Sequence, residues 1–429
     1  MTTGDIKVDY LARVEGEGAL DIRVKDGEIV DLKLRIFEPP RFFQGFLVGR
    51  KYDEVPGIVS RICGICPVSH QITAIQALED AFGVRPSLQT KRLRKLLALS
   101  QWIQSHTLHI YMLALPDFLG YESILAMAQD HMDAVKRALK LKRLGNDLTV
   151  LLGGREVHPV TAVINGFTSL PPVEELRAIQ RRLEDALDDA VETVRLCASL
   201  EVPDFSWDAE HVALRSEEGY AVNEGRLVST KGLDIPAWEY RSHIKEKQVP
   251  HSNALHSYIV GRGSFLVGPL ARVNLNADRL SPRAKEAMKA SGVRFPSFNP
   301  FHSALARAIE LVHAIEESIR IIDDLDELVP EDSGYSIKPG QGFAITEAPR
   351  GALYHSYKVN DQGLIEAADI VSPTAHNVNN MEEDLRRFVP RVLDLPHDEA
   401  TLKCEMVVRN YDPCISCSVH FLKLNIVRE

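Results

Sequence analysis

Two pairs of cysteines at opposite ends of the chain constrain the fold more than any other feature of the sequence. Cys63 and Cys66 lie near the N-terminus, and Cys414 and Cys417 lie near the other end of the 429-residue chain. Soft thiolates in Cys-x-x-Cys turns bind zinc, copper(I), iron–sulfur clusters or nickel in preference to magnesium or calcium. Pairs that hold a structural zinc usually lie close together in sequence, because the metal stabilises a small fold. The split between the two ends therefore predicts a buried centre that the whole fold assembles.

Other interpretations of the cysteines stay open at this point. Each pair is also compatible with a structural zinc site or with a redox-active dithiol. The remaining cysteines, Cys197 and Cys404, belong to no such motif. Because Cys197 lies in a leucine-rich predicted helix, we expect it to be a small, buried apolar side chain.

The composition excludes several classes of protein. Hydrophobic residues make up 45% of the chain and charged residues 26%, which is typical of a globular protein rather than a disordered, collagen-like or coiled-coil chain. A formal net charge of −10 argues against sequence-independent binding of nucleic acid. No apolar run approaches the length of a membrane span, and the N-terminus lacks the basic and apolar segments of a signal peptide. We therefore expect a cytoplasmic location.

The N-terminal part of the chain, residues 1–40, is rich in β-strand signals. Strands are expected at 6–8, 19–24 and 28–36. The sequence Lys25-Asp26-Gly27 between the last two predicts the turn of a β hairpin.

Helices are expected farther along the chain, where apolar residues recur at helical spacing. Their predicted ranges are 69–82, 86–111, 117–144 (one or two helices), 171–200 and 300–325, with glycine- and proline-rich connections at 153–172, 261–269 and 338–351. Ser69 is the expected N-cap of the first helix, and Gly83 is its expected left-handed C-cap. We therefore predict a mainly α fold with peripheral β-structure (α+β), in which one domain, 1–429, has a helical core and an N-terminal β hairpin region.

The residues around the cysteines resemble a known family. The segments Arg61-Ile-Cys63-Gly-Ile-Cys66-Pro-Val-Ser-His70 and Asp412-Pro-Cys414-Ile-Ser-Cys417-Ser-Val-His420 are together similar to the two metal-binding motifs of the large, catalytic subunit of [NiFe] hydrogenases. Similar segments also occur at 13–16, 154–159, 267–272 and 347–351, so the resemblance spans nearly the whole chain. The run at 37–43 and the C-terminal motif look most like the cytoplasmic branch, whose members couple dihydrogen to NAD(P) or a deazaflavin.

The resemblance implies a role for each paired cysteine. Cys63 and Cys414 would be terminal nickel ligands. Cys66 and Cys417 would bridge the nickel to an iron that carries carbonyl and cyanide ligands. Such a centre supports reversible heterolytic cleavage of dihydrogen, with the Cys414 thiolate as the first proton acceptor.

Residues around the cysteines also acquire implied roles. Glu15 would relay the proton from Cys414, and the Arg350 guanidinium would lie over the metals. Thr374 would donate a hydrogen bond to a cyanide ligand, and Asp412 would hold Arg350 or an adjacent donor in place. His70 would lie beside a bridging cysteine.

A second metal ion, magnesium or iron, is implied for Gln44, the Ile370 carbonyl and His420. Family members usually carry Glu where this chain has Gln44. An amide oxygen can still bind magnesium, although it brings no charge. The identity of the ion at this second position stays open.

Partner proteins are implied by what the chain lacks. It has no spare cysteines for an iron–sulfur relay, so we expect a small hydrogenase subunit that carries the clusters, docked around the cysteines and His158. Diaphorase-type accessory subunits are the expected electron acceptors. Residues 421–429 are an expected C-terminal extension, removed after His420 by a maturation endopeptidase. The alternative function is a metal-free hydrogenase-like subunit of a respiratory complex, and the zinc and dithiol interpretations also remain.

Overall fold

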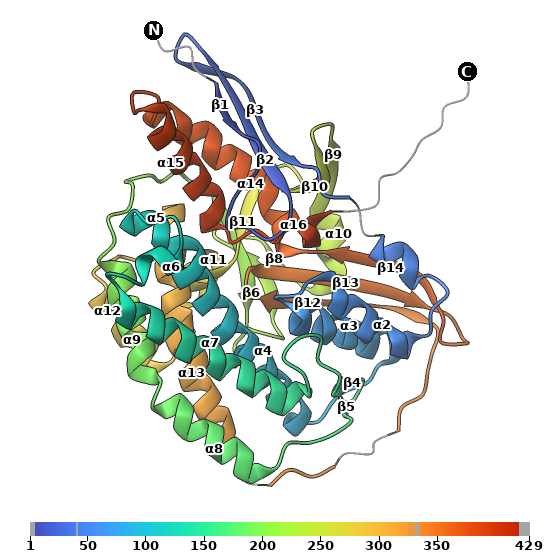
Figure 1. Ribbon diagram of the computed structural model, residues 1–429. Helices are drawn as coiled ribbons and strands as arrows, with labels where there is room; N and C mark the ends of the chain where they lie inside the picture. Colours follow the sequence, from blue (N-terminus) through green and yellow to red (C-terminus); the bar gives the residue numbers. More distant parts are fainter. Residues whose placement is uncertain (1–4, 40–41, 326, 331–333, 420–429) are drawn as a thin grey trace, which may run out of the picture.

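A bundle of long helices forms one side of the molecule (Figure 1). The computed structural model describes residues 5–39, 42–325, 327–330 and 334–419. The bundle contains α4 (Leu88–Leu108), α7 (Met132–Gly153), α8 (Val173–Glu184), α9 (Leu187–Ala198) and α13 (Ser303–Asp323), and α4 and α13 each pack against several of the others. Gly145 of α7 allows the closest approach, because a Cβ there would lie 2.7 Å from the Gln104 nitrogen of α4.

The remaining α-helices lie outside this bundle. They are α1 (Phe43–Leu47), α2 (Val55–Val59), α3 (Pro67–Phe82), α5 (Leu115–Leu119), α6 (Ile124–Met127), α10 (Tyr240–His243), α11 (Pro269–Asn276), α12 (Pro282–Ala290), α14 (Pro373–Phe388), α15 (His397–Asn410) and α16 (Ile415–Ser418). A π-helix, η3 (His109–Ala114), continues α4. No helix among the described residues is long and apolar enough to cross a membrane.

The strands of the described chain form small sheets above and beside the bundle in the view of Figure 1. The N-terminal sheet is β1 (Ile6–Val8), β2 (Gly18–Lys25) and β3 (Glu28–Ile36); a second sheet is β12 (Gly340–Ala348), β13 (Gly351–Val359) and β14 (Ile365–Val371), and both are antiparallel. A mixed sheet has the order β11 (Phe265–Val267), β6 (Glu210–Arg215), β7 (Arg226–Ser229) and β8 (Asp234–Ile235). Two further sheets have two strands each: β9 (Ile244–Val249) with β10 (Ser252–Ile259), and β4 (Ala162–Val163) with β5 (Gly166–Phe167).

The helix α3 lies directly on the β12–β13 pair. Gly342 of β12 makes this contact possible, because a Cβ there would lie 2.0 Å from the Ala77 carbonyl oxygen of α3. Cys66 is the N-cap residue of α3, and Pro67 is its first helical residue. Packing of α3 on the sheet therefore fixes the position of the first cysteine pair relative to the β12–β13 turn, which contains Arg350.

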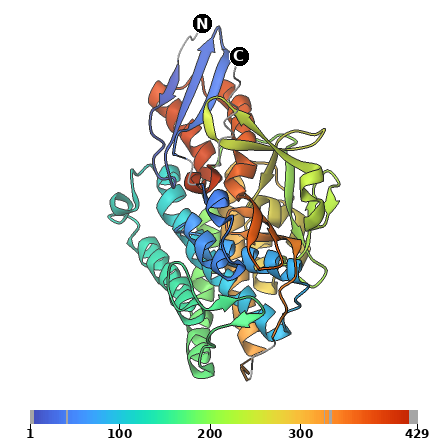
Figure 2. The ribbon, with the colours of Figure 1, turned by 90° about the vertical axis from the view of Figure 1, so that its right-hand side faces the viewer.

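The N-terminal segment and the segment with the second cysteine pair lie side by side. Glu15 forms an isolated parallel β-bridge with Cys414, in which the Ile415 amide donates to the Glu15 carbonyl at 2.8 Å. The sheet β1–β3 also packs beside α14 and α15, as both views show (Figures 1 and 2). The second cysteine pair is thus attached to the N-terminal segment by backbone hydrogen bonds.

Several predictions from the sequence are confirmed, and others are wrong. The three N-terminal strands are present, and Gly83 caps α3 with a φ of 70°. The helix begins at Pro67 rather than after Ser69, because proline is pre-organised for a first helical position. The predicted helix 171–200 is two helices, α8 and α9. The one or two helices predicted over 117–144 are three, α5, α6 and α7, of which α7 continues to Gly153.

The predicted connection at 338–351 is also wrong. This segment contains β12, a mostly buried strand of nine residues. Its glycines suggested a loop, but Gly340 and Gly342 instead let the strand approach α3 closely.

Candidate metal centre

The four paired cysteines converge in the interior of the molecule. The Sγ atoms of Cys414 and Cys417 are 2.8 Å apart, and those of Cys63 and Cys414 are 3.3 Å apart. The Sγ atoms of Cys63, Cys66 and Cys417 all lie within 4.8 Å of one another. Each of the four residues is buried and none is in a disulfide. Donors separated by most of the chain thus form one cluster of four sulfur atoms.

Short helical elements orient these thiols. Cys63 directly follows a 3₁₀ turn, η2 (Ser60–Ile62), and its Sγ accepts hydrogen bonds from the amides of Ile65 at 3.3 Å and Cys66 at 3.2 Å. Cys414 is the N-cap residue of α16, and Cys417 lies in that helix one turn later. Cys66 is the N-cap residue of the longer helix α3, where the helix N-terminus favours a thiolate.

Four thiolates this close together require a cation. Hydrogen bonds from the other thiols, that of Cys414 first, lower the pKa of Cys66 well below its ordinary value. Burial raises the pKa values of Cys414 and Cys417 well above theirs. Protein groups alone therefore favour the thiolate form of Cys66 and disfavour that of Cys414 and Cys417, whereas soft metal cations would compensate the charge of all four sulfurs. The donor set fits the nickel–iron centre implied by the sequence.

Arg350 lies in the turn between β12 and β13 and is held by Asp412. Its Nε donates to the Asp412 carbonyl oxygen at 2.6 Å, and an Nη donates to the Asp412 carboxylate at 3.0 Å. Burial opposes the charged form, but Asp412 and the cysteines, Cys414 first, raise the pKa of Arg350 well above its ordinary value. Nη1 is buried and has no hydrogen-bond partner among the described residues. This donor remains for a group bound at the cluster.

The backbone of the Arg350 turn is itself supported by a buried ion network that the sequence analysis missed. Arg272 of α11 donates to the carbonyls of Ala348 at 2.8 Å and Pro349 at 2.9 Å. It also forms ion pairs with Glu310 of α13 at 2.6 Å and Glu347 of β12 at 3.0 Å, and all three side chains are fully buried. The one signal in the sequence was an arginine within an otherwise apolar segment, Pro269–Val273.

Glu15 is in contact with the cluster. Cys414 Sγ donates to Glu15 Oε2 at 3.0 Å, and the Ser416 amide donates to the same oxygen at 3.2 Å. The Ser416 hydroxyl in turn donates to Glu38 Oε1 at 2.6 Å. Glu38, which the sequence analysis did not single out, is thus a second carboxylate held by Ser416 near the cluster.

Thr374 contacts the second cysteine pair, and His70 lies near the first. The Thr374 hydroxyl, in the first turn of α14, accepts a hydrogen bond from the Cys414 amide at 2.9 Å and retains its own proton for donation. His70 shares a hydrogen bond between its Nδ1 and His355 Nε2 at 3.2 Å, while its Nε2 is buried and unpartnered among the described residues. His70 also contributes to the lowered pKa of Cys66.

The predicted second metal position is only partly described. Gln44 of α1 and Ile370 of β14 are brought together, because Gln44 Nε2 donates to the Ile370 carbonyl at 3.0 Å. To bind an ion together with this carbonyl, the amide would have to present its oxygen instead. His420 lies outside the described residues.

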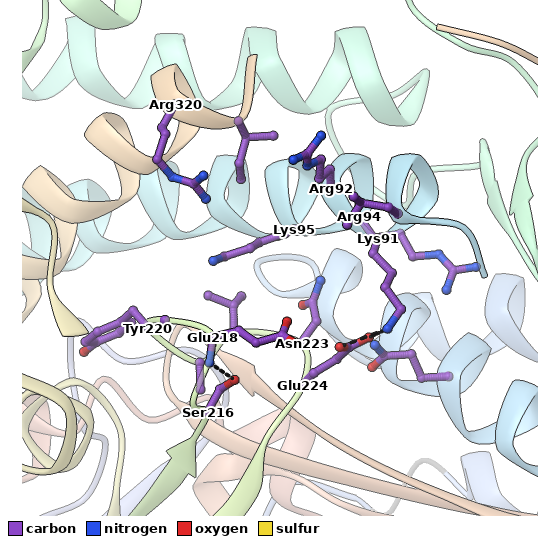
Figure 3. Close-up of a pocket in the computed structure, with 16 residues that line it drawn as sticks. Lys91, Arg92, Arg94, Lys95, Ser216, Glu218, Tyr220, Asn223, Glu224 and Arg320 are labelled. Carbon is purple, nitrogen blue, oxygen red and sulfur yellow. Dashed lines mark hydrogen bonds and ion pairs between the residues drawn. The ribbon is translucent and has the colours of Figure 1, made fainter. Parts of the chain in front are cut away.

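A separate cavity of about 250 Å³ lies between α4 and the loop at residues 216–224 (Figure 3). Basic side chains line it, but they form ion pairs with acidic neighbours. These pairs are Lys91–Glu224 at 3.0 Å, Arg92–Asp324 at 3.2 Å, Lys95–Glu317 at 2.7 Å and Arg320–Glu317 at 2.8 Å. No cysteine lines the cavity, and the basic side chains named above are paired with carboxylates. The cysteine cluster is therefore the stronger candidate for the functional site.

Comparison with known proteins supports this assignment. The sequence matches the family of nickel-dependent hydrogenases over residues 41–147 and 262–420. Sulfhydrogenase 1 subunit alpha of Pyrococcus furiosus is 39% identical over 98% of each chain, and the NAD-reducing hydrogenase HoxS subunit beta of Cupriavidus necator is 28% identical over 97% of this chain and 94% of its own. The structure is similar to that of an NAD⁺-reducing [NiFe]-hydrogenase, with a TM-score of 0.89, 28% identity, and coverage of 98% of this chain and 100% of the other.

The chain therefore belongs to the nickel-dependent hydrogenase family. The predicted family, the α+β fold class and the class of enzyme are confirmed. Membership also supports a nickel–iron centre in this chain, which the zinc, dithiol and metal-free alternatives lack.

The fixed position of Arg350 leads to a first prediction. Arg350→Lys keeps the positive charge but loses the planar donors that contact Asp412 and the free Nη1. We expect dihydrogen-dependent reduction of an artificial acceptor dye to fall by about 100-fold or more, as for loss of a fixed donor in other active sites, with nickel content unchanged. Arg85→Lys, at an exposed position, is the control. Near-normal turnover in nickel-loaded Arg350→Lys would contradict the role of the guanidinium.

Proposed function

We propose that this chain catalyses the reversible heterolytic cleavage of dihydrogen at a nickel–iron centre held by Cys63, Cys66, Cys414 and Cys417. One observation carries the proposal: four buried thiols from both ends of the chain meet beside a carboxylate and an unpartnered guanidinium nitrogen. The nickel–iron centre, when bound, would supply the Lewis acidity and electron-accepting capacity that splitting dihydrogen requires. The chain supplies ligands, orientation and a route for protons.

The ligand roles follow the motif positions. Cys63 and Cys414 would bind nickel terminally, while Cys66 and Cys417 would bridge nickel and iron. Carbonyl and cyanide on the iron would be met by Arg350 and Thr374, whose available donors lie next to the cysteines. The Thr374 hydroxyl and the buried Arg350 guanidinium suit a small anionic ligand such as cyanide, because these interactions are strong where water is excluded.

The proton route begins at the Cys414 thiolate. Glu15 lies within hydrogen-bond reach of this sulfur, at 3.0 Å, and is half-buried. A proton accepted by Cys414 would pass to Glu15, which needs only that reach to act as a base. Ser416 contacts both carboxylates, Glu15 through its backbone amide and Glu38 through its hydroxyl, so the proposed proton route ends at Glu15 in the part of the chain that the structure describes.

Electrons have to leave through another subunit. The two remaining cysteines, Cys197 of α9 and Cys404 of α15, are buried on separate helices and belong to no group of metal-binding side chains among the described residues, so neither suits cluster ligation. We propose an iron–sulfur subunit that docks where the first cysteine turn reaches the surface at Gly64. A cavity of about 210 Å³ lined by Ser60, Arg61 and His158 lies in this area, and His158 contacts the Ser60 carbonyl at 2.9 Å.

The terminal electron acceptor is proposed from the relatives. Two of the similar proteins are named for NAD reduction, so we propose diaphorase-type accessory subunits, NAD(P) as acceptor and a cytoplasmic location.

A magnesium or iron ion at Gln44, the Ile370 carbonyl and His420 is part of the proposal. So is removal of residues 421–429 by a maturation endopeptidase; these residues lie outside the described part of the chain.

Removing one sulfur tests the function. Cys417→Ala deletes a proposed bridging ligand, so we expect loss of nickel and of dihydrogen/deuterium exchange together. Cys197→Ala deletes an equally buried sulfur that belongs to no motif and serves as the matched control. Nickel content is measured by elemental analysis, and exchange by mass spectrometry of the gas phase. A Cys417→Ala protein with full nickel and normal exchange would overturn the proposal.

The proton route is tested by Glu15→Gln, which keeps the shape of the side chain but cannot carry a proton. We expect exchange and turnover to fall by about 100-fold or more, the typical contribution of general acid–base catalysis, with the metal content preserved. Glu17→Gln, two residues away and exposed, is the control. If Glu15→Gln exchanges at the rate of the unmodified enzyme, the proton leaves Cys414 by another route.

A further inference from the structure

A second group of metal-binding side chains lies away from the four cysteines. His251 follows β9 at the hairpin turn, His256 lies on β10, and Glu382 lies on α14. One ligating atom from each residue falls within 4.8 Å of the other two. His256 and Glu382 are buried, and His251 is partly exposed. None of the three belongs to the cysteine motifs or to the proposed second metal position.

The carboxylate of this group is fixed from two directions. Glu382 Oε1 accepts a hydrogen bond from the Leu34 amide of β3 at 3.0 Å and contacts His251 Nε2 at 2.7 Å. Three separate elements, β3, the β9–β10 hairpin and α14, therefore meet at one carboxylate. Figure 1 shows β3, β10 and α14 side by side in this part of the molecule. A site held by several packed elements is pre-organised and does not depend on a mobile loop.

His256 provides the second, independent observation. The residue is only 1% exposed, and its Nε2 is buried without any hydrogen-bond partner among the described residues. A buried imidazole nitrogen usually has a partner, because leaving a polar atom unsatisfied costs about 1–3 kcal/mol. The rings of His251 and His256 lie edge to face with centroids 5.9 Å apart, and one ligating atom of each lies within 4.8 Å of a Glu382 oxygen. Burial also keeps the His256 imidazole neutral, since it lowers the pKa of that side chain to about 4.

We propose that His251, His256 and Glu382 form a binding site for a divalent transition metal of the zinc class. Two imidazoles with one carboxylate are a common zinc donor set, with a fourth position left for water. Imidazole ligands favour zinc over magnesium or calcium, which require mainly oxygen ligands. His251 is the exposed member, so the open position faces the solvent side. The ion would join the β9–β10 hairpin to α14 and so stabilise the end of the molecule that holds β3.

This site is distinct from the hydrogen-activating centre in residues and in donor type. Zinc binding here does not require nickel, and the proposal stands whether or not the four cysteines have the function given above. It predicts a binding event that can be measured in the complete enzyme with its nickel–iron centre in place, because zinc then has no access to the cysteine sulfurs.

The experiment uses the purified enzyme after dialysis against a chelator, titrated with Zn²⁺ alone and, in parallel, with Co²⁺ as a coloured substitute. We expect one additional equivalent of Zn²⁺ to bind and the melting temperature to rise. His256→Ala should weaken this binding by about 100-fold or more, because even residues that only orient ligands contribute about 10–100-fold. His243→Ala, a nearby histidine outside the group that pairs loosely with Glu239 at 3.8 Å, is the matched control.

Glu382→Gln keeps the test decisive if His256→Ala does not fold, because the amide oxygen can still accept from the Leu34 amide. Loss of Zn²⁺ binding and of the cobalt absorption bands in Glu382→Gln, with retained dihydrogen activity and with binding intact in His243→Ala, would establish the site. No additional equivalent in the unmodified enzyme, or equal binding in all variants, would overturn it.

Discussion

Charge compensation in a buried cluster of four sulfurs is the constraint on which the rest of the structure depends. Thiols at separations of 2.8 and 3.3 Å cannot all lose their protons in a low-dielectric interior unless cations are bound between them. The chain therefore has to bring its two ends together and hold them there. It does so with the backbone bridge between Glu15 and Cys414 and with the packing of α3 on the β12–β13 pair.

The guanidinium beside the cluster needs equally firm support. Arg350 is buried, and an unpaired buried charge would be strongly destabilising, so Asp412 holds it through two hydrogen bonds. Arg272 then fixes the backbone just before Arg350 by binding two successive carbonyls. Glu310 and Glu347 compensate the charge of Arg272. Removing one partner of such a buried network typically lowers the free energy of unfolding by about 3–5 kcal/mol, so these ion pairs hold the turn firmly.

Much of the candidate site could be predicted from the sequence because its signals are local. Two cysteines at a fixed short spacing, Gly83 at a helix end and the Lys25-Asp26-Gly27 turn each report a structure formed by neighbouring residues. Partnerships between distant residues carry no such signal. The ion pairs of Arg272 with Glu310 and Glu347 join α11, α13 and β12, and no periodicity in any one of these segments indicates its partners.

Glycine was the most misleading residue in the predicted fold. Gly340 and Gly342 suggested a connection, because glycine is common in loops, whereas their function here is to let a buried strand contact the backbone of α3. Likewise, Ser69 is a good N-cap residue, yet Pro67 already starts the helix and leaves Cys66 at its N-terminus. The first difference reflects packing of the strand on α3, whereas the second reflects the local preference of proline for a first helical position.

Nickel X-ray absorption spectroscopy on the purified enzyme tests the convergence of the two chain ends most directly. If the paired cysteines bind one nickel next to an iron, the nickel spectrum will show a coordination shell dominated by sulfur and a nearby iron scatterer, with nickel and iron each near one per chain. A nickel shell of nitrogen and oxygen alone, or a protein that contains zinc and no nickel, would contradict this structure of the site.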